Sequence, residues 1–281
     1  MKTYSLSSDG TTDPIGSVPL TLEEVSNFMI RRARQLVDEL VKQRGQAEPP
    51  FLAEDLAKLQ GINKIEKHDL GNFDATLFST GDGCIMKINA AHPPVRQNFS
   101  CAHEIGHTLL HELCSQIGAN NAEFRLVSST IGSKSEERLC DIAAAELLMP
   151  EAIFTKYLLG FGVSVNSIER LAQVFQVSKE AAAIRIEKVS PEPCLSVIWR
   201  RAQKIRSKGF MGKLNGRAVY LTERDCPPLV KAYESDRSVR SFRSFEIGGI
   251  KKRWLMESKG FGRDKWRYVI SLLFPERQCK A

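Results

Sequence analysis

The sequence predicts an α+β protein with three successive parts: a mixed N-terminal part, a short helical module and a C-terminal part rich in strands. Apolar residues recur at helical spacing in long segments of the N-terminal half. Short segments of strand composition follow one another in the C-terminal third, separated by glycine-containing turns. A chain of 281 residues with 42% hydrophobic residues is long enough for two domains or one large one. We place the boundaries at 1–19 for a disordered tail, then 20–160, 161–190 and 191–281.

The N-terminal part is expected to begin with a long helix. Thr21 and Glu24 have the spacing of a capping box, and an apolar stripe runs from there to about Arg44. Pro49-Pro50 separates this helix from a short helix at 51–60. Three strands are then expected, at 62–68, 73–80 and 84–89, with Gly81-Asp82-Gly83 as a hairpin turn.

The next helix carries the most informative motif of the chain, His103-Glu104-Ile105-Gly106-His107. Positions four apart lie on one face of a helix, so His103 and His107 can direct two imidazoles at one zinc ion. Glu104 lies one step round the helix, where its carboxylate can reach a water molecule on the metal. This layout predicts a zinc-dependent peptidase.

A catalytic zinc normally takes three protein ligands, so the motif supplies only two of them. His111 lies on the same helical face, but each four-residue step rises about 6 Å, which is too far for convergence on one ion. The extended motif with a third histidine six residues after the second fails, since Leu113 stands there. The third ligand is therefore expected to be a carboxylate from another helix.

A second helix with suitable carboxylates is expected to start at Ser133, which forms a capping box with Glu136. Glu137 and Asp141 are four apart and share a face of this helix. Glu137 can bind the metal, while Asp141 accepts a hydrogen bond from the outer nitrogen of a ligand histidine. A solvated acidic helix start is the alternative interpretation. Glu136 and Glu146 are the other candidate ligands.

Two blocks of the sequence together resemble the ImmA/IrrE family of metallopeptidases. The first is Phe99-Ser100-Cys101-Ala102-His103-Glu104-Ile105-Gly106-His107 with the nearby Leu110-His111, and the second runs from Glu137 and Asp141 through Ala143-Ala144-Ala145-Glu146-Leu147-Leu148-Met149-Pro150. The resemblance covers roughly residues 20–190. It implies a minimal, gluzincin-like zincin domain in which His103, His107 and Glu137 hold Zn²⁺ and Glu104 is the catalytic residue.

Members of this family cleave helix-turn-helix repressor proteins and so activate silenced genes. One branch, tied to the radiation and desiccation response, adds a helical module and a C-terminal domain resembling GAF folds. The length and layout of this chain look like that branch. The resemblance implies an endopeptidase that derepresses stress-response or mobile-element genes, and a small-molecule ligand in the C-terminal domain, although no ligand-specific motif is present.

The substrate backbone is expected to bind along a strand. Zinc peptidases of this type use an edge strand for strand addition. The strand before the zinc helix is our candidate, with Cys84, Ile85, Met86, Lys87, Ile88 and Asn89 along the substrate.

The charge is divided unevenly, which favours a second role for the C-terminal half. Residues 1–184 hold 17 Lys and Arg against 23 Asp and Glu, a net charge of −6, whereas residues 185–281 hold 23 against 10, a net charge of +13. Segments 166–177 and 178–189 read as a helix-turn-helix with few base-reading groups. A DNA-binding regulator with a non-catalytic metal site is therefore the alternative function, and a plain helical packing module fits this segment equally well.

The C-terminal part is expected to contain strands at 195–199, 217–221, 252–256 and 266–273, with turns at 215–216 and 260–262. The chain has seven cysteines, an odd number without a Cys-x-x-Cys pair. This pattern predicts free thiols and a cytoplasmic location. No apolar stretch has the length of a membrane span or the form of a signal peptide, so no membrane partner is expected.

Overall fold

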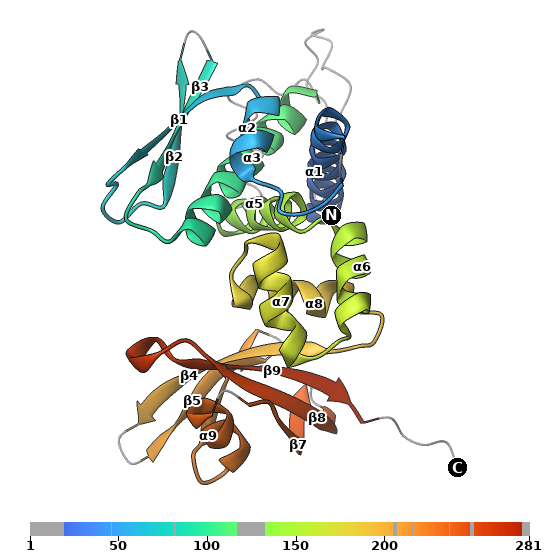
Figure 1. Cartoon of the computed structure of the whole chain (residues 1–281), viewed down its shortest axis with the longest axis vertical. Helices are drawn as coiled ribbons and strands as arrows, with labels where there is room; N and C mark the ends of the chain where they lie inside the picture. The colour runs from blue at the N-terminus through green and yellow to red at the C-terminus, as the bar shows by residue number, and fades with distance from the viewer. Residues whose placement is uncertain are drawn as a thin grey trace, which may run out of the picture.

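The computed structural model describes residues 20–45, 47–80, 83–116, 133–204, 207–214, 216–235, 237–247 and 250–276 (Figure 1). The predicted tail at 1–19, the turn residues 81–82 and Asn215 lie outside the described residues.

Within the described residues, the N-terminal part combines four helices with a three-stranded sheet. Its strand order is β1-β3-β2, with β1 parallel and β2 antiparallel to β3. The elements are α1 (Leu22–Arg44), α2 (Ala53–Leu59), β1 (Ile62–His68), β2 (Ala75–Thr80), β3 (Gly83–Asn89), α3 (Pro94–Gln116) and α5 (Ser133–Leu148).

Helix α1 forms as its capping residues predict. The Thr21 side chain accepts a hydrogen bond from the backbone of Glu24, and the Glu24 carboxylate accepts one from the Thr21 backbone N–H at 2.8 Å. Gly45 ends the helix in the left-handed region, at φ 70°. The buried stripe faces the other helices and consists of Val25, Met29, Ala33, Leu36, Val37 and Leu40.

Three helices lie between the N-terminal part and the large sheet (Figure 1): α6 (Glu151–Phe161), α7 (Val165–Phe175) and α8 (Lys179–Val189). Ser164 and Ser178 cap α7 and α8 with their side chains. Gln176 takes a left-handed conformation at φ 51° and separates the two helices.

The C-terminal part is a six-stranded antiparallel sheet of order β6-β5-β4-β9-β8-β7. Its elements are β4 (Leu195–Lys204), β5 (Ser207–Leu214), β6 (Arg217–Thr222), α9 (Pro227–Glu234), β7 (Val239–Ile247), β8 (Ile250–Phe261), the short 3₁₀ helix η1 (Asp264–Trp266) and β9 (Tyr268–Pro275). Trp266, predicted in a strand, lies in η1 instead.

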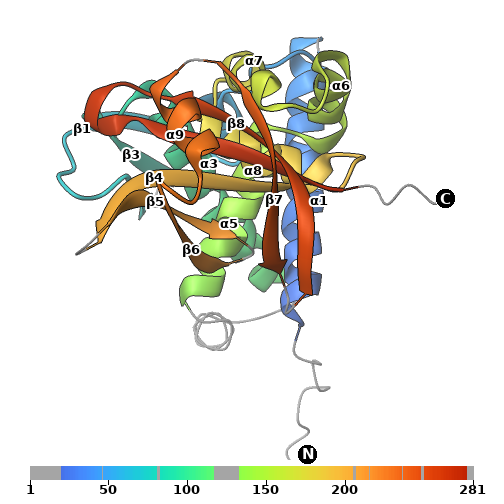
Figure 2. The ribbon, with the colours of Figure 1, turned by 90° about the horizontal axis from the view of Figure 1, so that it is seen from below.

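The large sheet is covered on both faces. Helices α7 and α8 contact one face and α9 contacts the other (Figures 1 and 2). One continuous buried cluster reaches from α1 through α8 to Ile270 and Leu272 of β9, so the C-terminal part shares a core with the helices. A second cluster, around Trp199 and Phe210, lies on the α9 side. Within the described ranges, no helix is both long and apolar enough to span a bilayer.

Candidate active site

The site is built where α3 crosses α5. The two helices approach so closely at Gly106 that a Cβ atom there would lie 2.8 Å from the Cα atom of Cys140. Glycine is therefore required for helix packing, although it lowers helix propensity by about 1 kcal/mol. The close approach brings the two histidines of α3 next to the acidic first turns of α5.

His103, His107 and Glu137 converge at this crossing. The Glu137 carboxylate lies 3.1 Å from Nε2 of His103 and 3.8 Å from Nε2 of His107. The histidine side chains are 17% and 28% exposed, and that of Glu137 is 60% exposed, so the site opens to solvent. Two imidazoles and one carboxylate that face one another on an open surface fit the ligand set of a catalytic zinc ion.

Two further carboxylates lie beside the outer nitrogens of the histidines, one of them at hydrogen-bond distance. Asp141 Oδ1 lies 3.0 Å from Nδ1 of His103, in the position predicted for it. Glu136 Oε1 lies 3.6 Å from Nδ1 of His107. Such contacts leave Nε2 for the metal and orient the rings. Glu136, considered as a ligand from the sequence, thus lies on the outer side of His107.

The other candidate ligands do not reach the site. Glu146 is 2% exposed and is paired with Arg34 at 2.8 Å and Arg185 at 2.5 Å. His111 is exposed on a later turn of α3. The Glu146 carboxylate is therefore engaged by the two arginines and is not available to the metal site.

Cys140, one of the seven cysteines predicted to be free thiols, lies beside the two histidines. Ligand atoms of His103, His107 and Cys140 lie within 4.8 Å of one another, so the thiol is a second possible third ligand. Cys140 is fully buried, and burial raises the pKa of its thiol, which disfavours the thiolate that zinc binds. The Glu137 carboxylate, by contrast, faces the Nε2 atoms of both histidines.

Glu104 lies on α3 directly after His103 and is partly buried. Burial raises the pKa of its carboxyl group, while His107 and His103 oppose that effect. A carboxylate with a raised pKa is a stronger base than one in water.

The strand β3 was predicted to be an edge strand that binds substrate, and this prediction is wrong. β1 and β2 pair with β3 along its length from Cys84 to Asn89, so it has no free edge for strand addition. Met86 and Ile88 are buried core residues. The alternation of apolar and polar residues indicates a strand but does not show the order of strands in a sheet. Here β1 pairs with the edge of β3 opposite to β2, which makes β3 the central strand.

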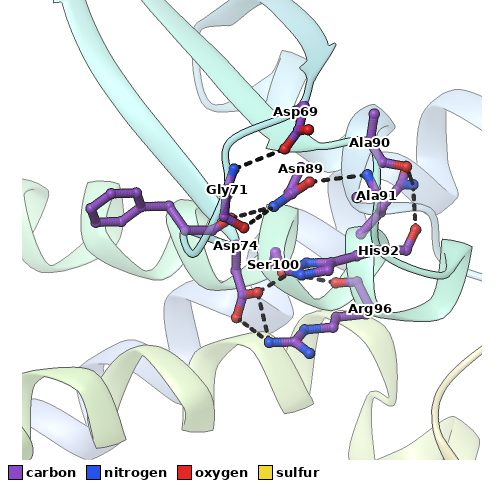
Figure 3. A network of polar contacts seen from close by, with 12 residues as sticks. Asp69, Gly71, Asp74, Asn89, Ala90, Ala91, His92, Arg96 and Ser100 are labelled. Atoms are coloured by element: carbon purple, nitrogen blue, oxygen red, sulfur yellow. Dashed lines mark hydrogen bonds and ion pairs between the residues drawn. The ribbon is translucent and has the colours of Figure 1, made fainter.

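Asn89 has a structural role instead (Figure 3). Its buried side-chain nitrogen donates to the carbonyl oxygens of Gly71 at 3.1 Å and Phe73 at 2.8 Å, and its oxygen accepts from Ala91 N–H at 3.0 Å. Asp74, from the same loop before β2, pairs with Arg96 at 2.7 Å on α3. These contacts fix the start of α3 against the small sheet.

A known peptidase family matches the part of the chain that contains this site. Residues 60–187 match the peptidase M78 family model, described as the IrrE N-terminal-like domain. The radiation response metalloprotease IrrE of Deinococcus radiodurans is 32% identical over 117 residues, which cover 41% of this chain and 34% of that protein. The protein of the same name from Deinococcus deserti is 30% identical over 129 residues, 44% of each chain. The matched segment thus spans less than half the length of either relative.

A solved structure shares the fold over most of the chain. A Mycobacterium tuberculosis transcriptional regulator superposes with a TM-score of 0.56 at 15% identity, covering 90% of this chain and 80% of that one. This likeness concerns the fold alone. The family match includes both metal-site helices, so residues 60–187 of this chain are similar to the IrrE N-terminal-like domain of the peptidase M78 family.

Proposed function

We propose that this protein is a zinc-dependent endopeptidase. The observation that carries the proposal is the convergence of two Nε2 atoms, on His103 and His107, upon the exposed carboxylate of Glu137, with Glu104 beside them on α3. When bound there, zinc would supply a Lewis acid and lower the pKa of its water toward about 7.

The residues around the site supply the remaining steps. Glu104 accepts the proton of the attacking water and delivers it to the leaving amine. Asp141 holds the outer nitrogen of His103 by a hydrogen bond, which keeps Nε2 of that ring directed to the centre of the site, and Glu136 lies near the outer nitrogen of His107.

We place the substrate backbone along β2 rather than β3. Strand addition requires a free edge, and among the residues that the structure describes β2 is an edge strand of the small sheet. Among the helices, β1 lies mainly against α2, whereas β2 contacts α3, the helix with the zinc motif. The open edge of Ala75–Thr80 is therefore on the side of the sheet nearer the candidate site.

The proposed substrate is a helix-turn-helix transcriptional repressor in the cytoplasm, whose cleavage releases stress-response or mobile-element genes. The resemblance of both motif blocks to the ImmA/IrrE family supports this substrate class. The names of the two curated relatives, radiation response metalloproteases, support a stress response. We retain a GAF-like C-terminal domain as part of this proposal.

The alternative, a DNA-binding regulator, is less well supported because α8 is not available as a recognition helix. Three of its charged side chains contact the rest of the protein: Lys179 pairs with Glu169 at 2.6 Å, Glu180 with Arg200 at 2.6 Å, and Arg185 with the buried Glu146. A recognition helix must instead present such side chains to the major groove.

The direct test is incubation of the purified protein, with one equivalent of zinc, with a helix-turn-helix repressor from the same genome. We expect cleavage by the wild type, and at least about a 100-fold loss in Glu104→Gln, because the carboxamide cannot accept the proton. Zinc content measured on both proteins should be one per chain, because Glu104 is not a ligand.

Equal cleavage by Glu104→Gln would overturn the mechanism. Salt-dependent binding of duplex DNA with a preferred sequence, together with no cleavage of any repressor tested, would favour the alternative function.

A further inference from the structure

A cavity of about 510 Å³ lies away from the metal site, where α7 and α8 meet the end of β8. Its lining includes Glu169 of α7, Lys179 of α8, and Lys259, Phe261, Arg263 and Arg267 from β8 and the segment that follows it. Nothing in the proposed peptidase mechanism uses these residues. The volume falls in the range of small-ligand sites, about 300–1,000 Å³.

The charge of the lining selects for an anion. Four cationic side chains face the cavity with one carboxylate among the lining residues. Glu169 forms ion pairs with two of the cations: its carboxylate lies 2.6 Å from Lys179 Nζ and 3.5 Å from Lys259 Nζ. Both ammonium groups also lie over the ring of the buried Phe261, at 5.1 and 5.7 Å from its centroid. Positive charge is therefore concentrated in a concave site, where the field is strongest.

Two of these cations are already positioned. The Arg267 guanidinium donates to the carbonyl oxygens of Tyr233, Ser235 at 3.1 Å and Gly262 at 3.3 Å, which fixes it against the end of α9. The Lys259 side chain is only 16% exposed and is held between Glu169 and the Phe261 ring. A site whose donors are fixed loses little conformational entropy when an anion binds.

An exposed indole stands between the cavity-lining residues Arg263 and Arg267 in the sequence. Trp266 is 75% exposed, which is unusual for the largest apolar side chain. It ends η1, whose first residue, Asp264, has a positive φ of 48° although it is not glycine. The backbone of Trp266 packs on the cavity-lining Gly262, where a Cβ atom would lie 2.5 Å from the Trp266 carbonyl oxygen. The Trp266 backbone thus lies next to the cationic lining, and the Lys265 ammonium lies over its exposed indole, 5.3 Å from the ring centroid.

We propose that this cavity binds a nucleoside polyphosphate, with the phosphates among Lys179, Lys259, Arg263 and Arg267 and the base stacked on Trp266. Several cations together match a polyphosphate better than a singly charged anion. Base stacking on an aromatic side chain contributes about 1–3 kcal/mol. The 3′ or 5′ end of a single strand offers the same chemistry, so the test must separate these two sources.

The test is isothermal titration of the full-length protein with ATP, inorganic triphosphate and a single-stranded 12-mer. We expect one ATP per chain, at least tenfold weaker binding in Lys259→Gln and in Arg263→Gln, and no change in Arg224→Gln, an exposed cation near α9 outside this cavity. Trp266→Ala should weaken ATP about tenfold and leave triphosphate binding unchanged. Arg263 and Trp266 are exposed, so their variants should fold, which a thermal unfolding curve checks.

Three results would overturn the proposal: no ATP binding at millimolar concentration, an equal loss of affinity in Arg224→Gln, or tighter binding of the 12-mer than of ATP. The first excludes the ligand, the second shows non-specific charge attraction, and the third assigns the cavity to a nucleic-acid strand. None of these readouts depends on peptidase activity, so the proposed function and this inference can fail separately.

Discussion

Gly106 shows how one residue sets the geometry of the candidate zinc site. It stands in the middle of α3, where alanine would be the better helix former, and it lies against the backbone of Cys140. A methyl group there must push α5 away from α3. Because the histidines belong to α3 and Glu137 to α5, such a shift would also separate the candidate metal ligands.

We therefore expect Gly106→Ala to lower the free energy of unfolding by about 1–3 kcal/mol, the usual cost of overpacking. Gly160→Ala is the matched control, since it is also a helical glycine but has no atom within 4 Å of the added Cβ. That control should gain up to about 1 kcal/mol from helix propensity. Urea unfolding of the two variants measures both effects, and a stabilised Gly106→Ala would contradict the packing argument.

The sequence predicts much of the candidate site at the residue scale because helical spacing is local. His103, Glu104 and His107 follow from one turn of helix, and the pair Glu137 and Asp141 follows from another. The positions of Glu136 and Cys140 depend on how α5 is rotated against α3. That rotation is a tertiary property, so the sequence pattern left Glu136 as one candidate ligand among several and did not distinguish Cys140 from ordinary core residues.

At the scale of elements, Asn89 joins the small sheet to the zinc helix. The loss of its three hydrogen bonds in Asn89→Ala should lower the free energy of unfolding by about 2–4 kcal/mol, since each buried bond contributes about 1 kcal/mol and partners are left unsatisfied. Lys87→Ala on the same strand should cost less than about 1 kcal/mol, because it removes only a contact with the Phe78 ring. Equal effects in denaturant titrations would show that the Asn89 contacts do not stabilise this junction.

The sequence analysis did not predict β5, and the composition of this strand explains why. β5 contains Gly209 and Gly212, which weaken its strand pattern. Added Cβ atoms at these positions would lie 2.3 Å from the Leu221 carbonyl oxygen and 2.8 Å from the Trp199 ring, so close packing requires glycine there. The order of the strands in both sheets could not be predicted from the sequence either, because pairing between distant segments leaves no local pattern of residues.

At the scale of the whole molecule, Glu146 links four helices. This buried carboxylate of α5 accepts hydrogen bonds from Arg34 of α1, Arg185 of α8 and the backbone N–H of Glu151 in α6. The same helix carries Glu137. The network therefore connects the helix that supplies the third candidate ligand to the module that contacts the large sheet.

Replacement of Arg185 by methionine should lower the free energy of unfolding by about 3 kcal/mol, because it leaves a buried carboxylate with incomplete compensation. Lys188→Met, an exposed change on the same helix, should stay within about 0.5 kcal/mol of the wild type. Thermal and urea unfolding of both variants provide the measurement. An unchanged stability in Arg185→Met would show that Arg34 alone compensates Glu146.

The ligand set of the metal is the central claim, and zinc X-ray absorption spectroscopy of the zinc-loaded protein tests it most directly. The account predicts only nitrogen and oxygen neighbours at about 2.0–2.2 Å, from His103, His107, Glu137 and water. A sulfur neighbour at about 2.3 Å would contradict it, because the third ligand would then be Cys140 rather than Glu137.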